Sequence, residues 1–477
     1  MPIRPVLSIL LLIPSFLVVS SCTQEPPAQD RGYYDELPLD NLEAEQANMV
    51  YTVRTASPAS QILNITLEFP VGSNDQPRFH GGTEGEYDIL EVTLTNEAGA
   101  VIPHERDGKY IETKSDVRGL LTLNYQVQIG GIGRHGHQGY MKEGFAAFDG
   151  RIYLIPVNAD HIREVQVTFD YMSLGDGLTL ITPWQPTEAP NTYRLYDYGK
   201  HAYLFKSLKK SMTVIGAYER VDETIGSSQV QVYTSLEWDE TFRATTTQNS
   251  LTLFRYFNET LGYEVEGPYQ MVWTTGTDDG KKIWTAVWSN GMAYEMFPER
   301  PSMVNRNLEL VGHRLAHPMH EYAPWGMRFK EKDEHWFLEG WASYIELRAI
   351  EETGLFDVKP RWARLYNVWQ SHLAGGENQD WPLATEQDIE DSDVKEYVHY
   401  YKAPLVVWLL AQEAIEATGG QKDLEDFMRY AYGKYKGFNG DLPLRDELES
   451  FFAHDFGPFW DTYINREGTV PDVFTSM

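Results

Sequence analysis

The spacing of apolar residues changes its period once along this chain of 477 residues, and that change limits the folds the chain can adopt. From about residue 49 to about residue 233, apolar and polar residues alternate, as they do in strands with one buried face. The clearest alternating runs are 63–69, 121–129 and 165–171. From about residue 248 apolar residues recur at helical spacing, with a short mixed segment over 267–296. We therefore expect a β domain followed by a mostly helical α+β region.

The domain boundaries follow from these patterns and from local composition. Residues 23–47 are rich in Gln, Glu, Pro and Asp, which is typical of a flexible tether. Near the other end, Pro404 begins an apolar helix that Gly419 and Gly420 terminate. The predicted segments are a leader (1–21), a tether (22–47), a β-sandwich (48–235), an α+β domain (236–395) and a C-terminal helical part (396–477).

The leader has the form of a secretion signal. Arg4 is the only charge before an apolar run over 6–19, which is too short to span a bilayer comfortably. Cys22 follows that run and is the only cysteine, so it forms no internal disulfide. The sequence Val19-Ser20-Ser21-Cys22 resembles the bacterial lipobox, which implies lipidation at Cys22. Thr23 after the cysteine favours the outer membrane by the same resemblance, so we expect a lipid-anchored protein of the bacterial cell envelope.

The net charge argues against anionic partners. The chain has 40 basic and 70 acidic residues, for a formal charge of −30. A chain this acidic is repelled by nucleic acids and by anionic membrane surfaces. We expect a peptide or protein ligand, and contact with the membrane only through the lipid anchor.

Two histidines and one glutamate have the spacing of a metal site. His313 and His317 are four residues apart, so they share one face of a helix, and Glu339 on the next predicted helix can complete a zinc triad. By chance, about 0.3 such histidine pairs are expected in this composition, so the later glutamate makes the pattern specific. We predict one Zn²⁺ ion, although two imidazoles and a carboxylate suit several divalent ions.

The residue after the first histidine departs from the zinc-peptidase pattern. In His-Glu-x-x-His the glutamate removes a proton from the metal-bound water, and here that position is Arg314. A positioned base contributes about 10²–10⁴-fold to the rate. A guanidinium at about 5 Å from a site of net charge +1 adds about 3 kcal/mol of repulsion at a dielectric constant near 20. We therefore expect weakened zinc binding and impaired hydrolysis.

Two further residues are candidate parts of this site. Glu309 lies one turn before His313 on the same face and is a candidate substitute base, with an exposed helix carboxylate as the simpler alternative. His335 lies one turn before Glu339 and is a candidate fourth ligand or ligand partner, with an ordinary interface histidine as the alternative.

Four motifs in order resemble the gluzincin aminopeptidases, the superfamily of aminopeptidase N and the glycyl aminopeptidases. The motifs are Leu253–Tyr263, Glu339-Gly340-Trp341, Tyr400-Tyr401-Lys402-Ala403 and the closing part from Thr418 to Pro471. The resemblance covers the chain from about residue 250 and implies a thermolysin-like domain after the β-sandwich. It also implies that His313, His317 and Glu339 bind zinc, and that Tyr400 stabilises the oxyanion of the transition state.

The substrate-binding motif of that superfamily is altered. Its counterpart lies at 290–295, where Ala293 stands at the position of the amine-binding glutamate and Glu295 follows two residues later. Gly291 and Glu295 are the candidate substrate contacts, while Ala403 and Pro404 replace the usual glycine context after the lysine.

Three functions remain open from the sequence. The first is a metallopeptidase impaired by Arg314, and the second is a pseudopeptidase that binds peptides or a protein partner without cleaving them. The third is a purely structural envelope protein.

Overall fold

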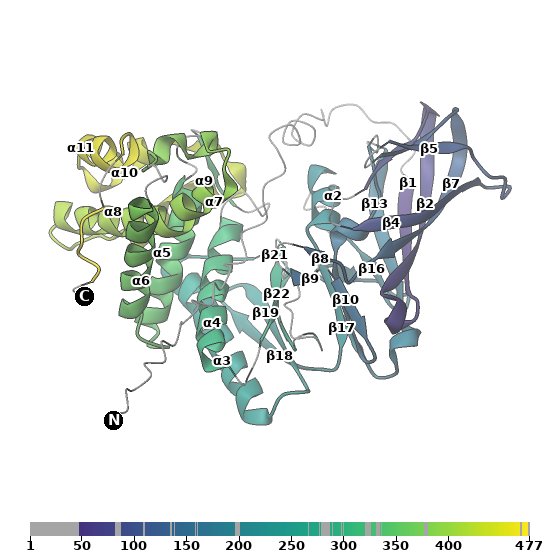
Figure 1. Ribbon diagram of the computed structural model, residues 1–477, viewed down its shortest axis with the longest axis horizontal. Coiled ribbons are helices and arrows are strands. Elements are labelled where there is room, and N and C mark those ends of the chain that lie inside the picture. The colour runs from purple at the N-terminus through teal and green to yellow at the C-terminus, as the bar shows by residue number, and fades with distance from the viewer. Residues whose placement is uncertain are drawn as a thin grey trace, which may run out of the picture.

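The structure is a computed structural model that describes residues 47–475 apart from short gaps. The gaps are 82–86, 108–109, 134–135, 138, 158, 160, 196–200, 266, 276, 278–286, 289, 297, 299, 320–325, 331–333, 335, 376–379 and 468–469. Cys22, the tether and His335 therefore lie outside the described residues. Figure 1 shows an N-terminal half built mainly of sheets and a C-terminal half built mainly of helices. The predicted α+β class is confirmed.

The largest sheet of the N-terminal half has seven strands, in the order β15-β16-β13-β1-β2-β7-β4. Side chains at alternate positions of its central strands are buried, and cross-strand partners lie side by side on the same face: Leu63 pairs with Val127, and Leu67 with Leu123. The strands are β1 (Ala47–Thr55), β2 (Ile62–Asp75), β4 (Asp88–Asn96), β7 (Val117–Gln128), β13 (Ile162–Asp170), β15 (Gln185–Pro186) and β16 (Thr192–Arg194). The three alternating runs predicted from the sequence are β2, β7 and β13.

Two four-stranded sheets share the core of this half. Their buried side chains, including Phe79, Phe148 and Ile215, pack in one cluster with those of the seven-stranded sheet. The first sheet, β12-β3-β6-β5, contains Ile155–Pro156, Arg78–His80, Tyr110–Thr113 and His104–Asp107. The second, β10-β11-β17-β14, contains Gly139–Lys142, Phe145–Asp149, Met212–Gly216 and Thr179–Ile181.

A five-stranded sheet begins the second half and crosses the boundary predicted after residue 235. Its order is β18-β19-β20-β22-β21, so β19 is hydrogen-bonded to β20 from beyond that boundary, and β18 joins the sheet through β19. Alternation alone cannot show this, because a strand reads the same whichever sheet it joins. The strands are β18 (Tyr218–Ile225), β19 (Ser228–Ser235), β20 (Pro268–Thr274), β21 (Val287–Trp288) and β22 (Gly291–Glu295).

A small apolar cluster joins this sheet to the β10-β11-β17-β14 sheet. Val214 and Phe145 pack in it with Val272 and Ala293. Ala293, at the predicted position of the amine-binding glutamate, is therefore buried between the two halves of the molecule.

α3 packs on the five-stranded sheet, and α3, α4 and α8 contact α5, which is buried on nearly every side. α5 packs against α4 on one side and against α8 on another. The main helices are α3 (Glu240–Leu261), α4 (Pro301–Ala316), α5 (Trp336–Glu352), α6 (Lys359–Ala374) and α8 (Ala403–Ala417). The others are α2 (His201–Lys209), α7 (Ser392–Tyr397), α9 (Leu424–Tyr435), α10 (Leu444–Phe452) and α11 (Gly457–Phe459).

The helix ends agree with the local sequence. Gly419, with a φ of +60°, follows the end of α8 as predicted. α4 ends at Ala316 and continues as one 3-10 turn, His317–Met319, because Pro318 has no N–H for a further α-helical hydrogen bond. Within the described part of the chain, the helices are too short or too polar to cross a lipid bilayer.

Candidate metal centre

Two close helix contacts bring the candidate ligands together. α4 approaches α5 at Gly312, where an added Cβ would lie 3.0 Å from Cα of Glu346. α5 approaches α8 at Gly340, where an added Cβ would lie 2.9 Å from a methyl group of Val407. A side chain at either position would push the helices apart, so these glycines hold Glu339 over the last turn of α4.

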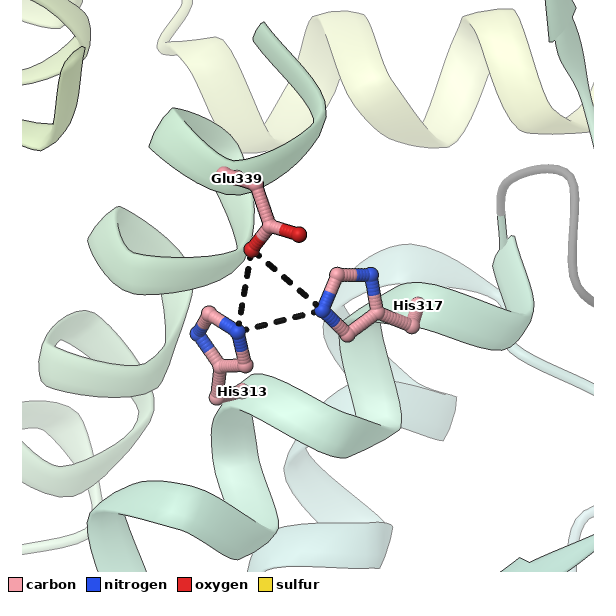
Figure 2. A group of neighbouring side chains, drawn as sticks. All are labelled: His313, His317 and Glu339. Carbon is pink, nitrogen blue, oxygen red and sulfur yellow. Dashed lines mark hydrogen bonds and ion pairs between the residues drawn. The ribbon is translucent and has the colours of Figure 1, made fainter. Parts of the chain in front are cut away.

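His313, His317 and Glu339 form a buried cluster in which one atom of each faces the others (Figure 2). Nε2 of His313 lies 3.1 Å from Nε2 of His317 and 3.3 Å from Oε2 of Glu339. Nε2 of His317 lies 3.6 Å from the same oxygen. The structure thus brings together the three residues predicted as metal ligands.

These distances fit a zinc ion. An ion that holds its ligand atoms at about 2.0–2.1 Å in a tetrahedron separates them from one another by about 3.3–3.4 Å. The three separations here lie around that value, and two imidazole nitrogens and a carboxylate oxygen are a common ligand set for zinc. Burial alone would raise the pKa of Glu339, but the adjacent His317 and His313 hold it well below its usual range. The carboxylate is therefore available as an anionic ligand.

The other nitrogen of His313 faces a second carboxylate. Nδ1 lies 3.1 Å from Oε2 of Glu346, at which distance a ring N–H donates to a carboxylate, and Oγ of Ser343 lies 3.4 Å away. A carboxylate behind a ligating histidine fixes the ring and leaves Nε2 as the ligand atom. Sequence reasoning assigned no role to Glu346. The signal was its position two turns after Glu339, on the same face of α5.

Arg314 points to the side of α4 that faces β22. Its Nε donates a hydrogen bond of 2.9 Å to the hydroxyl oxygen of Tyr294 on β22, and both side chains are buried. The guanidinium at the predicted base position is therefore part of the contact between α4 and the sheet. A guanidinium has no acceptor atom and stays protonated in proteins, so it cannot take a proton from water.

Tyr400 lies close to the cluster on a different element. It belongs to the π-helix η8 (Val398–Lys402), and its ring centroid is 6.2 Å from that of His313. Two side-chain contacts hold this π-helix: Nε2 of His399 lies 2.5 Å from Oε2 of the buried Glu386, and Nζ of the buried Lys402 lies 2.5 Å from Oδ1 of Asp380. Short π-helical segments are frequent at functional sites.

The other predicted site residues have different surroundings. The Glu309 carboxylate pairs with Arg306 and lies 3.3 Å from Nε of Arg361. Glu295 is buried and accepts a hydrogen bond of 2.9 Å from the backbone N–H of Thr277. Gly291 pairs with β20 on one side and β21 on the other, so β21 is the edge of the sheet among the described strands. A base role for Glu309 and substrate contacts at Glu295 and Gly291 stay predictions.

Comparison with known proteins found similar structures but no similar sequence family. No protein-family model and no curated protein matches the sequence. An aminopeptidase N family protein from Idiomarina loihiensis is similar in structure, with a TM-score of 0.72 and 12% identity over 90% of this chain and 78% of that one. An M1 zinc metallopeptidase from Deinococcus radiodurans, solved as a glutamate-to-alanine mutant bound to a Tyr-Ser-Ala substrate, has a TM-score of 0.53. It is 14% identical over 90% of this chain and 95% of that one.

The similarity covers both the sheet-rich and the helical half, and it agrees with the resemblance stated from the sequence. The chain therefore has the fold of the gluzincin, M1-type aminopeptidases, with a buried His-His-Glu group of the kind that holds zinc.

Proposed function

We propose that this chain is a zinc-binding, aminopeptidase-like protein that takes peptides and hydrolyses them poorly. The observation that carries the proposal is the pair of faces on α4. His313 and His317 meet Glu339 at zinc spacing, while Arg314 is bonded to Tyr294. The solved relatives are aminopeptidase-type proteins, one of them with a peptide substrate, which supports peptides as the ligand class.

The residues of the site divide the chemistry among them. His313, His317 and Glu339 would hold the ion, which when bound would polarise a peptide carbonyl and acidify a water molecule. The ring of Tyr400 lies 6.2 Å from that of His313, which supports the role of its hydroxyl as a donor to the oxygen that becomes negative during hydrolysis. Arg314 cannot complete the reaction, since the proton of the attacking water needs an acceptor. Loss of a positioned base slows such reactions by about 10²–10⁴-fold.

The second candidate is a pseudopeptidase that binds peptides or a protein partner without cleaving them. The hydrogen bond from Arg314 to Tyr294 favours it, because the cation is built into the packing of α4 on the sheet. Turnover of any peptide by the metal-loaded protein, lost on chelation, would exclude this candidate.

The first experiment is metal content by elemental mass spectrometry on the purified full-length chain, prepared without chelators. We expect about one zinc ion per chain, because the ligand atoms already have zinc spacing. A chain without zinc after dialysis against a zinc buffer would contradict the proposal and leave only binding or structural roles.

We also propose that the protein is anchored by lipid at Cys22 to the outer membrane. The support is the leader and lipobox-like sequence alone. Metabolic labelling with a radioactive or clickable fatty acid should mark the wild type and not Cys22→Ala. Equal labelling of both would contradict the anchor.

A further inference from the structure

A chain of charged groups, with buried carboxylates and partly buried guanidiniums, extends from His313 between α4, α5 and α6. Oε2 of Glu346 lies 3.1 Å from Nδ1 of His313, and the other carboxylate oxygen lies 3.9 Å from Nη1 of Arg306. The same Arg306 nitrogen donates to Oε2 of Glu309. That oxygen also lies 3.3 Å from Nε of Arg361. The groups therefore form one continuous path of contacts from the metal ligand to α6.

The path is nearly closed to solvent and balanced in charge. Glu346 and Glu309 are 4% and 7% exposed, and two guanidiniums match the two carboxylates. Burial and the neighbouring Arg306 lower the pKa of Arg361 to about 10, which still leaves it charged at neutral pH. Buried charges of this kind are costly unless paired, so removing one member leaves its neighbour uncompensated. Each pair in the path thereby depends on the next.

Packing leaves these groups little room to rearrange. The cavity among them has a volume of only about 10 Å³ and is bordered by Arg306, His313, Ser343, Glu346, Arg361 and Tyr400. That is about the space of one water molecule. The positions of the carboxylates are therefore set by the arginines and not by solvent.

We propose that Arg306, Glu309 and Arg361 are positioning residues for the zinc site. They hold Glu346 against Nδ1 of His313, which keeps Nε2 of that ring aimed at the metal. The inference rests on the proposed zinc binding and extends it to residues that do not touch the ion. It gives Glu309 a role as the link between two arginines, in place of the substitute base considered from the sequence.

The test measures zinc Kd by competition with a chelating dye, on the full-length chain. Glu346→Gln should weaken zinc binding by about 10–100-fold, the usual effect of losing a ligand's hydrogen-bond partner. Glu309→Gln and Arg361→Gln, one contact further out, should weaken it by about three- to tenfold. The cobalt-loaded protein gives a second readout, because its visible spectrum shifts when the orientation of a ligand changes.

A matched control lies on the same helix as Glu346. Arg348 on α5 pairs with Glu425, Glu351 and Glu352, away from the path. Arg348→Gln should leave the zinc Kd and the cobalt spectrum unchanged. A fall in zinc affinity as large as that of Arg361→Gln would mean that any lost ion pair on these helices loosens the site, and would overturn the proposal.

The outcomes separate this inference from the proposed function. A wild type that binds no zinc contradicts both. A wild type that binds zinc, with Glu309→Gln and Arg361→Gln unchanged in Kd and spectrum, overturns the inference alone.

The melting temperature of each metal-free variant is recorded as a check of folding. If Arg361→Gln does not fold, Arg361→Lys keeps the charge but loses the planar fork, so zinc binding about threefold weaker is expected. Unchanged binding by that lysine variant would overturn the inference.

Discussion

The two sides of helix α4 differ in what they retain of a zinc peptidase. The side that faces α5 has His313 and His317 within 3.6 Å of the Glu339 carboxylate, with Glu346 behind the first histidine. The side that faces β22 has Arg314, bonded to Tyr294. Neighbouring residues of a helix point about 100° apart, so the two functions are held by different surroundings. The comparison teaches that the residue at the base position of such a helix can change while the His-His-Glu group beside it keeps its geometry.

The difference has a physical cause in the partners of each side. The ligand side is fixed by Glu339 and Glu346 on one buried helix, so a change there leaves a buried polar group without its partner. On the other side, the phenol oxygen of Tyr294 accepts from the guanidinium that replaces the base. A buried cation is tolerated there because it has an acceptor.

The largest effect expected is loss of the metal. His317→Ala removes one of three ligands, and metal content should fall from about one zinc ion per chain to near zero after dialysis. His372→Ala is the matched control, since this histidine on α6 is equally buried and stacks on Tyr397. Elemental mass spectrometry of both variants is the measurement. Equal zinc in His317→Ala and wild type would place the metal elsewhere.

The next effect is on hydrolysis and concerns the altered side of α4. Arg314→Glu restores a carboxylate at the base position, and we expect peptide hydrolysis to rise by about 10²–10⁴-fold. A panel of fluorogenic aminoacyl and tripeptide substrates, with and without chelator, measures it. Arg314→Gln, which removes the cation without supplying a base, should hydrolyse peptides no faster than the wild type. No gain in a folded, zinc-loaded Arg314→Glu protein would locate the defect in the altered motif at 290–295.

A smaller effect tests whether the arginine is part of the packing of α4 on the sheet. Tyr294→Phe removes the oxygen that accepts from Nε of Arg314, and it should lower the free energy of unfolding by about 1–3 kcal/mol. Tyr269→Phe is the control, because the buried Tyr269 hydroxyl makes no hydrogen bond with the described residues. Denaturant unfolding compares them. If both variants lose the same free energy of unfolding, the hydrogen bond between Arg314 and Tyr294 does not stabilise the packing of α4 on the sheet.

The smallest effect expected is on zinc affinity, and it concerns the side of α4 that faces α5. Ser343→Ala removes a contact of 3.4 Å to Nδ1 of His313, which Glu346 already occupies at a shorter distance. We expect zinc binding to weaken by no more than about threefold, well below the effect of a lost carboxylate partner. Dye competition measures it. A loss as large as that of Glu346→Gln would mean that the serine, and not the carboxylate, orients the ring.

Much of the fold could be predicted because buried side chains recur every second residue in a strand and every three to four residues in a helix. β2, β7 and β13 lie on the predicted alternating runs, and α8 runs from Ala403 to Ala417, close to the predicted Pro404 start and glycine end. The assignment of strands to sheets could not be predicted in this way. β19 pairs in parallel with β20 across the whole of α3, and no local pattern contains that pairing.

In the candidate site, too, local spacing predicted some features and others needed tertiary contacts. The spacing of His313, His317 and Glu339 predicted the ligand set, because a four-residue step fixes two side chains on one helix face. The role of Glu346 needed the approach of α4 to α5 at Gly312. The direction of Arg314 needed the position of Tyr294, which comes from a strand twenty residues earlier.

By itself the sequence determined the main strands and helices, the His-His-Glu group and the arginine at the predicted base position, because each of these depends on residue type and local periodicity. Only the tertiary structure decided that the replacement cation is bonded to the sheet and that a path of charged groups extends from His313 to Arg361. The physical reason is that contacts between distant segments depend on how closely helices and strands pack. A few glycines and buried side chains set the distance between packed elements, and this distance is known only once the folded structure shows which elements are in contact.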